Sequence, residues 1–273
     1  MAAIDMKERW IWNRIAQGAV VLAGAFLLKW HYATAGADRL RWILAPTATL
    51  VELLTGVSFE FEPHAGYLNL ERRFLIADSC AGVNFLITAF LMLSLRRLLG
   101  ARSESPAWNA LPAAALIAYL STLVANTVRI SLALWLQRMP AEFGWAHSAQ
   151  FHRLEGICIY FGALLLLFAA GEKLRAQQTS SRSGRALWPL LVYYATALGL
   201  PLANGAYRRG ADFREHALFV LLIPWLWLLL IEAFRRARSW WSLAADPVSD
   251  AAAVNSANCH RPSSLRPPRE PGR

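Results

Sequence analysis

The separation of charged from apolar residues is the feature that most limits how this chain can fold. Long stretches hold no charged side chain, among them the four at residues 15–28, 111–128, 157–170 and 217–231. Arginines cluster between them, and the formal net charge is +10 although 56% of the residues are hydrophobic. A soluble core that buried all four stretches would leave a chain of 273 residues too little polar surface. Since a helix of about 20 apolar residues spans a bilayer, we predict an all-α polytopic membrane protein.

Hydropathy along the chain predicts six strong spans, at residues 15–33, 82–98, 109–131, 151–170, 187–204 and 215–234. A weaker apolar stretch at 42–57 contains Glu52 and is either a seventh span or a helix on the membrane surface. If this stretch does not cross the membrane, all the dense basic clusters fall on one side, at residues 7–14, 96–102, 173–185 and 235–238. The positive-inside rule identifies that side as the cytoplasm. If the stretch crosses, the clusters are divided between the two sides. We therefore expect six spans, an outer-surface helix, and both termini in the cytoplasm. Arg208, Arg209 and Arg214 are exceptions, because this topology leaves them outside.

The segments outside the spans have their own signatures. Residues 58–77 partly alternate apolar and polar side chains and are broken by Pro63 and Gly66, which predicts a short β-hairpin leading into Cys80. The first span has no small-residue cleavage site after it, so we expect it to be retained. We predict a catalytic core over 1–171, two additional membrane helices over 172–243 and a disordered cytoplasmic tail over 244–273. The basic residues lie at span ends rather than on one soluble face, so no nucleic-acid partner is expected.

Three short sequences combine chemically useful side chains: Asp78 to Asn84 (DSCAGVN), Asn126 to Ile130 (NTVRI) and His152 to Gly156 (HRLEG). In the six-span topology the second span begins outside, the third ends outside and the fourth begins outside. Cys80, Arg129 and His152 are therefore expected at similar depth on one rim of the membrane.

A thiol, a guanidinium and an imidazole together form a coherent set for acyl transfer or peptide cleavage. The imidazole can take the thiol proton and later protonate a leaving amine. The guanidinium can stabilise the thiolate or the oxyanion of a tetrahedral intermediate. A helix start near Cys80 adds a positive dipole end, and Gly82 permits close approach. Each residue also has a plainer reading: membrane cysteines are usually apolar fillers, as we expect for Cys158, and terminal arginines usually reach the headgroups. Cys259 is read as an incidental thiol of the tail.

The order Cys-x-Gly, Asn-x-x-Arg-Ile and His-x-x-x-Gly over successive spans resembles the exosortase/archaeosortase family. The similarity covers about residues 40–170, including LAPTATLVELLTGVSFEF before the cysteine, and HRLEGICIYFG is most like the exosortase K branch. Members are multi-pass membrane cysteine proteases or transpeptidases thought to process exported proteins with a C-terminal sorting signal: a short motif, a transmembrane helix and a basic tail. The resemblance implies a bacterial inner membrane location, a site facing the periplasm, and contact with membrane lipids.

Carried over to this sequence, the family pattern makes Cys80 the nucleophile, His152 the general base and acid, and Arg129 the stabiliser of the thiolate or oxyanion. Gly82, Asn126, Glu155 and Gly156 are expected to support them, with Glu155 orienting His152 or pairing with Arg153. The family often has Cys-Ser-Gly, whereas Ala81 stands in the middle here, which replaces a hydroxyl by a methyl beside the nucleophile. No cofactor and no metal are implied.

Three alternatives compete with this interpretation. His147, His152 and Glu155 could bind a metal in a membrane hydrolase, but their spacing matches no established zinc motif. A transport or scaffold protein would hold polar residues in mid-membrane and often has broken helices, whereas the residues of interest here are expected at one rim. A degenerate homologue that serves in assembly would not need the intact trio. A Cys80→Ala variant separates these cases, since only a thiol protease loses function.

Overall fold

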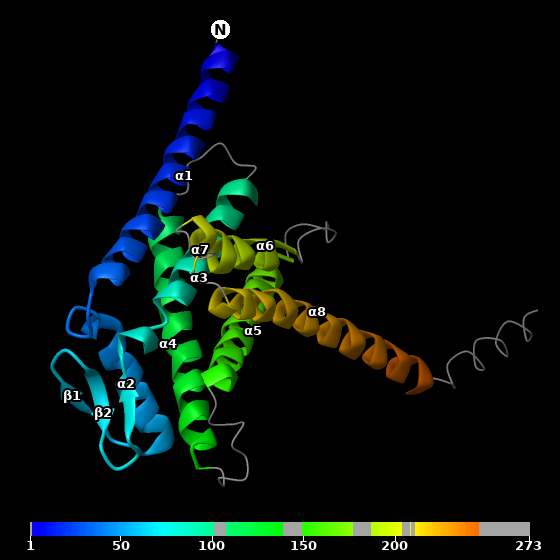
Figure 1. The fold of residues 1–273 in the computed structure, drawn as a ribbon. Helices are drawn as coiled ribbons and strands as arrows, with labels where there is room; N and C mark the ends of the chain where they lie inside the picture. Colours follow the sequence, from blue (N-terminus) through cyan, green and yellow to red (C-terminus); the bar gives the residue numbers. More distant parts are fainter. Residues whose placement is uncertain are drawn as a thin grey trace, which may run out of the picture. The chain divides into compact units, whose positions relative to one another are not determined.

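The computed structural model describes residues 2–100, 108–138, 149–176, 187–203, 208 and 211–245. These residues are mostly helical, with one small sheet (Figure 1). Five helical segments are long and apolar enough to cross a membrane: Glu8–Thr34, Asp78–Leu99, Ala110–Leu136, Arg153–Lys173 and Phe213–Arg238. The predicted class, a helical membrane-embedded protein, is thereby supported. The chain divides into two compact units, Met1–Pro224 and Trp225–Arg273, which we describe separately.

Helix α3 (Val83–Gly100) lies at the centre of the first unit. It packs against α1 (Ala2–Thr34), α4 (Ala110–Leu136) and α6 (Trp188–Tyr194), while α5 (Ala149–Ala176) packs mainly on α4. Because these helices surround it, α3 buries most of its residues from Val83 to Ser94. The helices around it expose large apolar side chains, among them Leu22, Phe26, Leu120 and Val124. Exposed apolar faces of this kind are suited to contact with lipid.

The weaker apolar stretch forms α2 (Arg41–Thr55), a helix of 15 residues. Its buried face packs against α4, and its last turn exposes Leu53 and Leu54. Fifteen residues rise only about 22 Å, less than the hydrocarbon thickness of about 30 Å. The helix ends at Gly56, whose φ of +70° is the left-handed conformation that terminates many helices.

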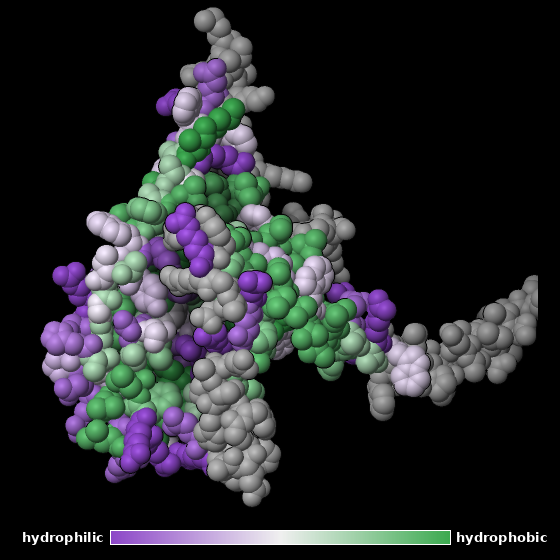
Figure 2. Space-filling view, viewed as in Figure 1, coloured by the Kyte–Doolittle hydropathy of each residue, from purple (hydrophilic) through white to green (hydrophobic). Residues whose placement is uncertain are grey.

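The segment between α2 and α3 forms three strands rather than the predicted hairpin. Strands β1 (Glu60–Glu62), β2 (Gly66–Asn69) and β3 (Phe74–Ile76) form an antiparallel sheet in the order β1-β2-β3. Asn69 makes the second turn, because its side-chain oxygen accepts a hydrogen bond of 2.6 Å from the backbone N–H of Arg72. The sheet lies beside α2 in Figure 1, and Figure 2 shows hydrophilic side chains gathered around it. Strand β3 ends at Ile76, four residues before Cys80.

The span predicted at 187–204 is not one regular helix. It consists of α6, a π-helical turn η4 (Ala195–Gly199) and α7 (Leu200–Ala203), of seven, five and four residues. Pro201 lacks the N–H that an α-helix would bond to residue 197, so the regular ladder cannot continue through this point. The last helix, α8 (Ala211–Ala245), covers the span predicted at 215–234, and its residues up to Pro224 belong to the first unit. From residue 246 on, the predicted tail lies outside the described residues.

Arg96 connects the far end of α3 to α5. Its guanidinium pairs with Glu172 and lies over the ring of Phe168, with 4.7 Å between the guanidinium carbon and the ring centroid. A Cβ added at Gly171 would stand 2.7 Å from Nη1 of Arg96. The arginine therefore rests on helix backbone where residue 171 has no side chain.

Candidate functional site

Cys80 is the last residue of a short 3-10 turn, η1 (Asp78–Cys80), between β3 and α3. The turn is held by the backbone bonds from Cys80 N to Ala77 O (2.9 Å) and from Ala81 N to Asp78 O (3.0 Å). Asp78 also accepts a bond of 2.7 Å from the N–H of Ser79. Gly82, at φ +70°, then turns the chain into α3, where the backbone N–H of Leu86 donates to Gly82 O at 3.1 Å. The cysteine thus immediately precedes the start of a long helix.

Gly82 leaves no room for a side chain. A Cβ at this position would lie 3.2 Å from Cγ2 of Thr122, 3.4 Å from Cγ of Asn126 and 3.4 Å from the hydroxyl of Tyr160. Both requirements, a positive φ and close packing, favour glycine. Side chains from α4 and α5 can therefore approach the backbone next to Cys80.

A chain of polar contacts runs from Cys80 to Arg129. The fully buried Asn126 donates from Nδ2 to the carbonyl oxygen of Cys80, and its Oδ1 accepts from the Tyr160 hydroxyl at 2.9 Å. Nη1 of Arg129 donates to the same hydroxyl at 3.3 Å, and the guanidinium carbon lies 5.6 Å from the Tyr160 ring centroid. Three elements, η1, α4 and α5, are joined by these contacts.

Arg129 lies against the backbone of α5. A Cβ at the buried Gly156 would stand 3.2 Å from Nε of Arg129, so glycine is needed where the arginine crosses the helix. Arg129 interacts electrostatically with both Cys80 and the buried Glu155. Of the residues predicted from sequence, the structure thus brings together Cys80, Gly82, Asn126, Arg129, Glu155 and Gly156.

His152 belongs to the first turn of α5, four residues before Gly156 and eight before Tyr160. Residues four apart on a helix share a face, so this position lies on the side of α5 that carries Gly156 and Tyr160. The side chain of His152 is outside the described part of the structure. Its approach to Cys80 stays a prediction.

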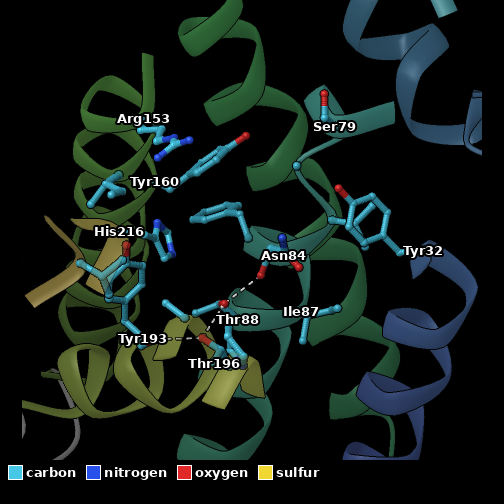
Figure 3. A pocket seen from close by; sticks show the side chains of 18 of the residues that line it. Tyr32, Ser79, Asn84, Ile87, Thr88, Arg153, Tyr160, Tyr193, Thr196 and His216 are labelled. Atoms are coloured by element: carbon cyan, nitrogen blue, oxygen red, sulfur yellow. Dashed lines mark hydrogen bonds between the residues drawn. The ribbon is translucent and has the colours of Figure 1, made fainter. Parts of the chain in front are cut away.

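A cavity of about 460 Å³ adjoins this cluster. Its lining comes from α1, η1, α3, α4, α5, α6, η4, α7 and the first turns of α8, and all of these residues belong to the first unit. Ser79 and Gly82, on either side of Cys80, line the cavity, whereas Cys80 itself is not among the lining residues. Figure 3 shows Arg153 and Ser79 at one end of the cavity, and Ile87, Tyr193 and Thr196 at the other.

Sequence reasoning missed three residues at this site. Tyr160 links Asn126 to Arg129, and its spacing of four residues from Gly156 was a usable signal. Lys29 donates from Nζ to Oδ1 of Asn84 at 2.7 Å, and Tyr32 interacts electrostatically with Cys80 and Arg129. A lysine within an apolar span is itself a reason to expect a functional site.

The metal alternative gains no support within the described residues, because no group of three or more His, Cys, Asp or Glu side chains there could hold an ion. His147, one of its suggested ligands, lies outside the described residues, as does Cys259. Cys158 is half-buried on α5. No family model matches the chain, and neither does any curated protein or solved structure. The resemblance to exosortases therefore still depends on the residues of the chain itself.

Proposed function

We propose that the chain is a membrane-embedded cysteine peptidase or transpeptidase of the exosortase kind. Cys80 is the nucleophile, His152 the general base and acid, and Arg129 the stabiliser of developing negative charge. The observation that carries this proposal is the contact chain Cys80–Asn126–Tyr160–Arg129, which connects two of these three residues across different helices. Their electrostatic interaction adds to it.

The proposed reaction proceeds through an acyl-enzyme. The imidazole of His152 takes the Sγ proton, and the thiolate attacks the carbonyl carbon of the scissile peptide bond. Arg129 stabilises the thiolate or the oxyanion, in surroundings where a half-buried guanidinium acts more strongly than in water. When the C–N bond breaks, His152 returns the proton to the leaving amine, and water or an acceptor amine then releases the acyl group from Cys80.

Several residues have positioning roles in this proposal. Asn126 holds the backbone at Cys80, and Tyr160 holds both Asn126 and Arg129. Gly156 leaves room for the guanidinium to cross α5. Because Arg129 combines a bond to Tyr160 with a ring contact, an ammonium would not reproduce its geometry. We expect Arg129→Lys to be nearly as inactive as Arg129→Ala.

The proposed substrates are exported proteins that end in a short motif, a transmembrane helix and a basic tail. In this proposal the protein resides in the bacterial inner membrane with both termini in the cytoplasm, and the site faces the periplasm. Support comes from the residues that line or adjoin the cavity. They come from the end of α1 and the starts of α3 and α5, the chain ends that the six-span topology puts outside.

Cells expressing the full chain provide the test. The masses of co-expressed membrane proteins with such C-terminal signals are compared between the wild type and single variants. Cys80→Ser, Arg129→Ala and His152→Ala should each leave the precursors uncleaved while the variant still inserts into the membrane. Cys158→Ser, a thiol exchange on α5 outside the contact chain, should cleave normally. Near-normal cleavage by any of the first three variants would show that the assigned roles are wrong.

A transport function is the second candidate, and one observation favours it. The interrupted segment α6–η4–α7 lines the cavity through Thr196, Ala197 and Pro201, and helix breaks beside a cavity are a feature of transporters. The sequence had predicted one span over residues 187–204, in which Pro189 and Pro201 could introduce kinks. A transporter would keep its activity in Cys80→Ala, which separates the two functions in the same cells.

A further inference from the structure

The charged residues that line the cavity have one sign. Lys29 on α1, Arg129 on α4 and Arg153 on α5 are all cations, and the lining includes no Asp or Glu among the residues that the structure describes. His216 on α8 also lines the cavity and interacts electrostatically with Arg153. Three elements of the bundle thus each direct one positive group to the same space.

No ion pair within the described ranges involves Lys29, Arg129 or Arg153. Glu155 interacts electrostatically with Arg129, but it does not line the cavity. Like charges around one cavity repel each other, and the repulsion grows where membrane and protein lower the local dielectric. An anion in the cavity would relieve this repulsion.

The rest of the lining is suited to an amphiphile rather than to a free ion. Apolar side chains, among them Val83, Phe85, Ile87 and Val220, line the same space. A volume of about 460 Å³ lies within the range of sites that hold ligands larger than inorganic phosphate. Arg153 lies at one end of the cavity and Ile87 at the other in Figure 3, so a charged group and an apolar group can be accommodated apart.

We propose that this cavity binds the phosphate of an anionic lipid headgroup through Lys29, Arg129 and Arg153. Guanidinium groups suit phosphate oxygens because several N–H donors face them at once, and the ammonium of Lys29 adds a compact charge. Lys29 is already held at the cavity by its bond of 2.7 Å to Asn84. The site needs no chemistry at Cys80, so it stands or falls independently of the peptidase proposal.

The test uses the full chain purified in uncharged detergent micelles. The apparent melting temperature is measured against the mole fraction of dioleoylphosphatidylglycerol, with dioleoylglycerol as the matched lipid without phosphate. A ligand that binds the folded state raises the melting temperature with a saturating dependence on its concentration. We expect that dependence for the phosphatidyl lipid alone. Equal stabilisation by both lipids would overturn the proposal.

Two variants locate the binding site. Lys29→Gln and Arg153→Gln should each move the lipid midpoint about tenfold higher, as expected for loss of one charge-assisted hydrogen bond. Arg153 is exposed, so its variant tests the site even if Lys29→Gln folds poorly. Arg72→Gln, which removes the same charge from the exposed sheet turn, should leave the midpoint unchanged. A midpoint that moves in neither of the first two variants, or moves as much in Arg72→Gln, refutes the site.

Two further probes separate other sources of negative charge. Inorganic phosphate that stabilises the protein as strongly as the lipid would replace the lipid assignment by a soluble anion. A peptide with two glutamates that binds where the lipid does not would replace it by an acidic protein segment. Either outcome overturns the proposal. Because Cys80→Ala removes only the thiol, its lipid midpoint should equal that of the wild type even if no substrate is ever cleaved.

Discussion

Gly82→Ala offers the sharpest test of how closely α4 and α5 approach the backbone next to Cys80. Gly82 and Gly56 share a φ of +70°, where an added Cβ costs about 1–2 kcal/mol. At Gly56 nothing lies within 4 Å of such a Cβ, whereas at Gly82 the nearest atom, Cγ2 of Thr122, lies at 3.2 Å. Overpacking of this kind costs about 1–3 kcal/mol more. We expect Gly56→Ala to lose about 1–2 kcal/mol of unfolding free energy and Gly82→Ala about 2–5 kcal/mol.

The unfolding free energies are measured by sodium dodecyl sulfate titration in mixed micelles, with the fluorescence of the 12 tryptophans as the signal. Thr122→Ser supplies a rescue, because it removes Cγ2 and keeps the hydroxyl that donates to Ala118 O at 2.7 Å. The double variant Gly82→Ala/Thr122→Ser should be more stable than the two single losses predict, by about 0.5–1 kcal/mol. Equal losses at positions 56 and 82, together with no rescue, would refute the packing around Gly82.

Two other predictions concern the contact chain and the topology. Tyr160→Phe leaves the buried Oδ1 of Asn126 without its donor, which should cost about 1–3 kcal/mol of unfolding free energy. The same variant removes the hydroxyl that accepts from Arg129, so the alkylation of Cys80 by iodoacetamide should be slower. In a background without other cysteines, a membrane-impermeant maleimide applied to sealed cells should label Glu71→Cys, in the sheet turn, and not Arg97→Cys, at the far end of α3.

Each of these predictions has a defined control. Tyr194→Phe removes a hydroxyl that donates to Leu221 O at 2.9 Å in more exposed surroundings, so it should cost less than Tyr160→Phe and leave Cys80 alkylation unchanged. Equal effects of the two tyrosine variants would contradict the contact chain. For the topology, permeabilised cells should label both introduced cysteines. Labelling of Arg97→Cys alone in sealed cells would reverse the proposed orientation.

The long helices were predictable because each carries an uncharged stretch too long for a strand or loop, as at 111–128 in α4. The sheet was predicted incompletely, since strands of three or four residues hold little periodicity and the second turn depends on the side chain of Asn69. Pro201 indicated a possible kink, because it lacks an N–H, but hydropathy did not predict the π-helical turn η4 that precedes it.

Within the site, the sequence predicted which residues would gather but not how they touch. Cys80, Arg129 and His152 were expected on one rim from the crossing pattern. The structure links Cys80 to Arg129 through Asn126 and Tyr160, and the side chain of His152 lies outside the described part. The link through Tyr160 could not be read from the alternation of spans, because it depends on the angle at which α5 faces α4. The cationic cavity also escaped sequence reasoning, since Lys29 and Arg153 belong to helices far apart in the chain.

The two arginines that rest on α5 have a mechanical consequence. Arg129 crosses the helix at Gly156 and Arg96 meets it at Gly171, fifteen residues further along. At 100° per residue these positions differ by only about 60° around the axis, and they are separated by about 22 Å. Arg129 and Arg96 contact α5 at two separate points on nearly the same side, so both contacts oppose rotation of α5 about its axis. A rotation of α5 would have to displace both guanidinium groups at once, which couples the end of α5 near Gly171 to the side chains beside the thiol.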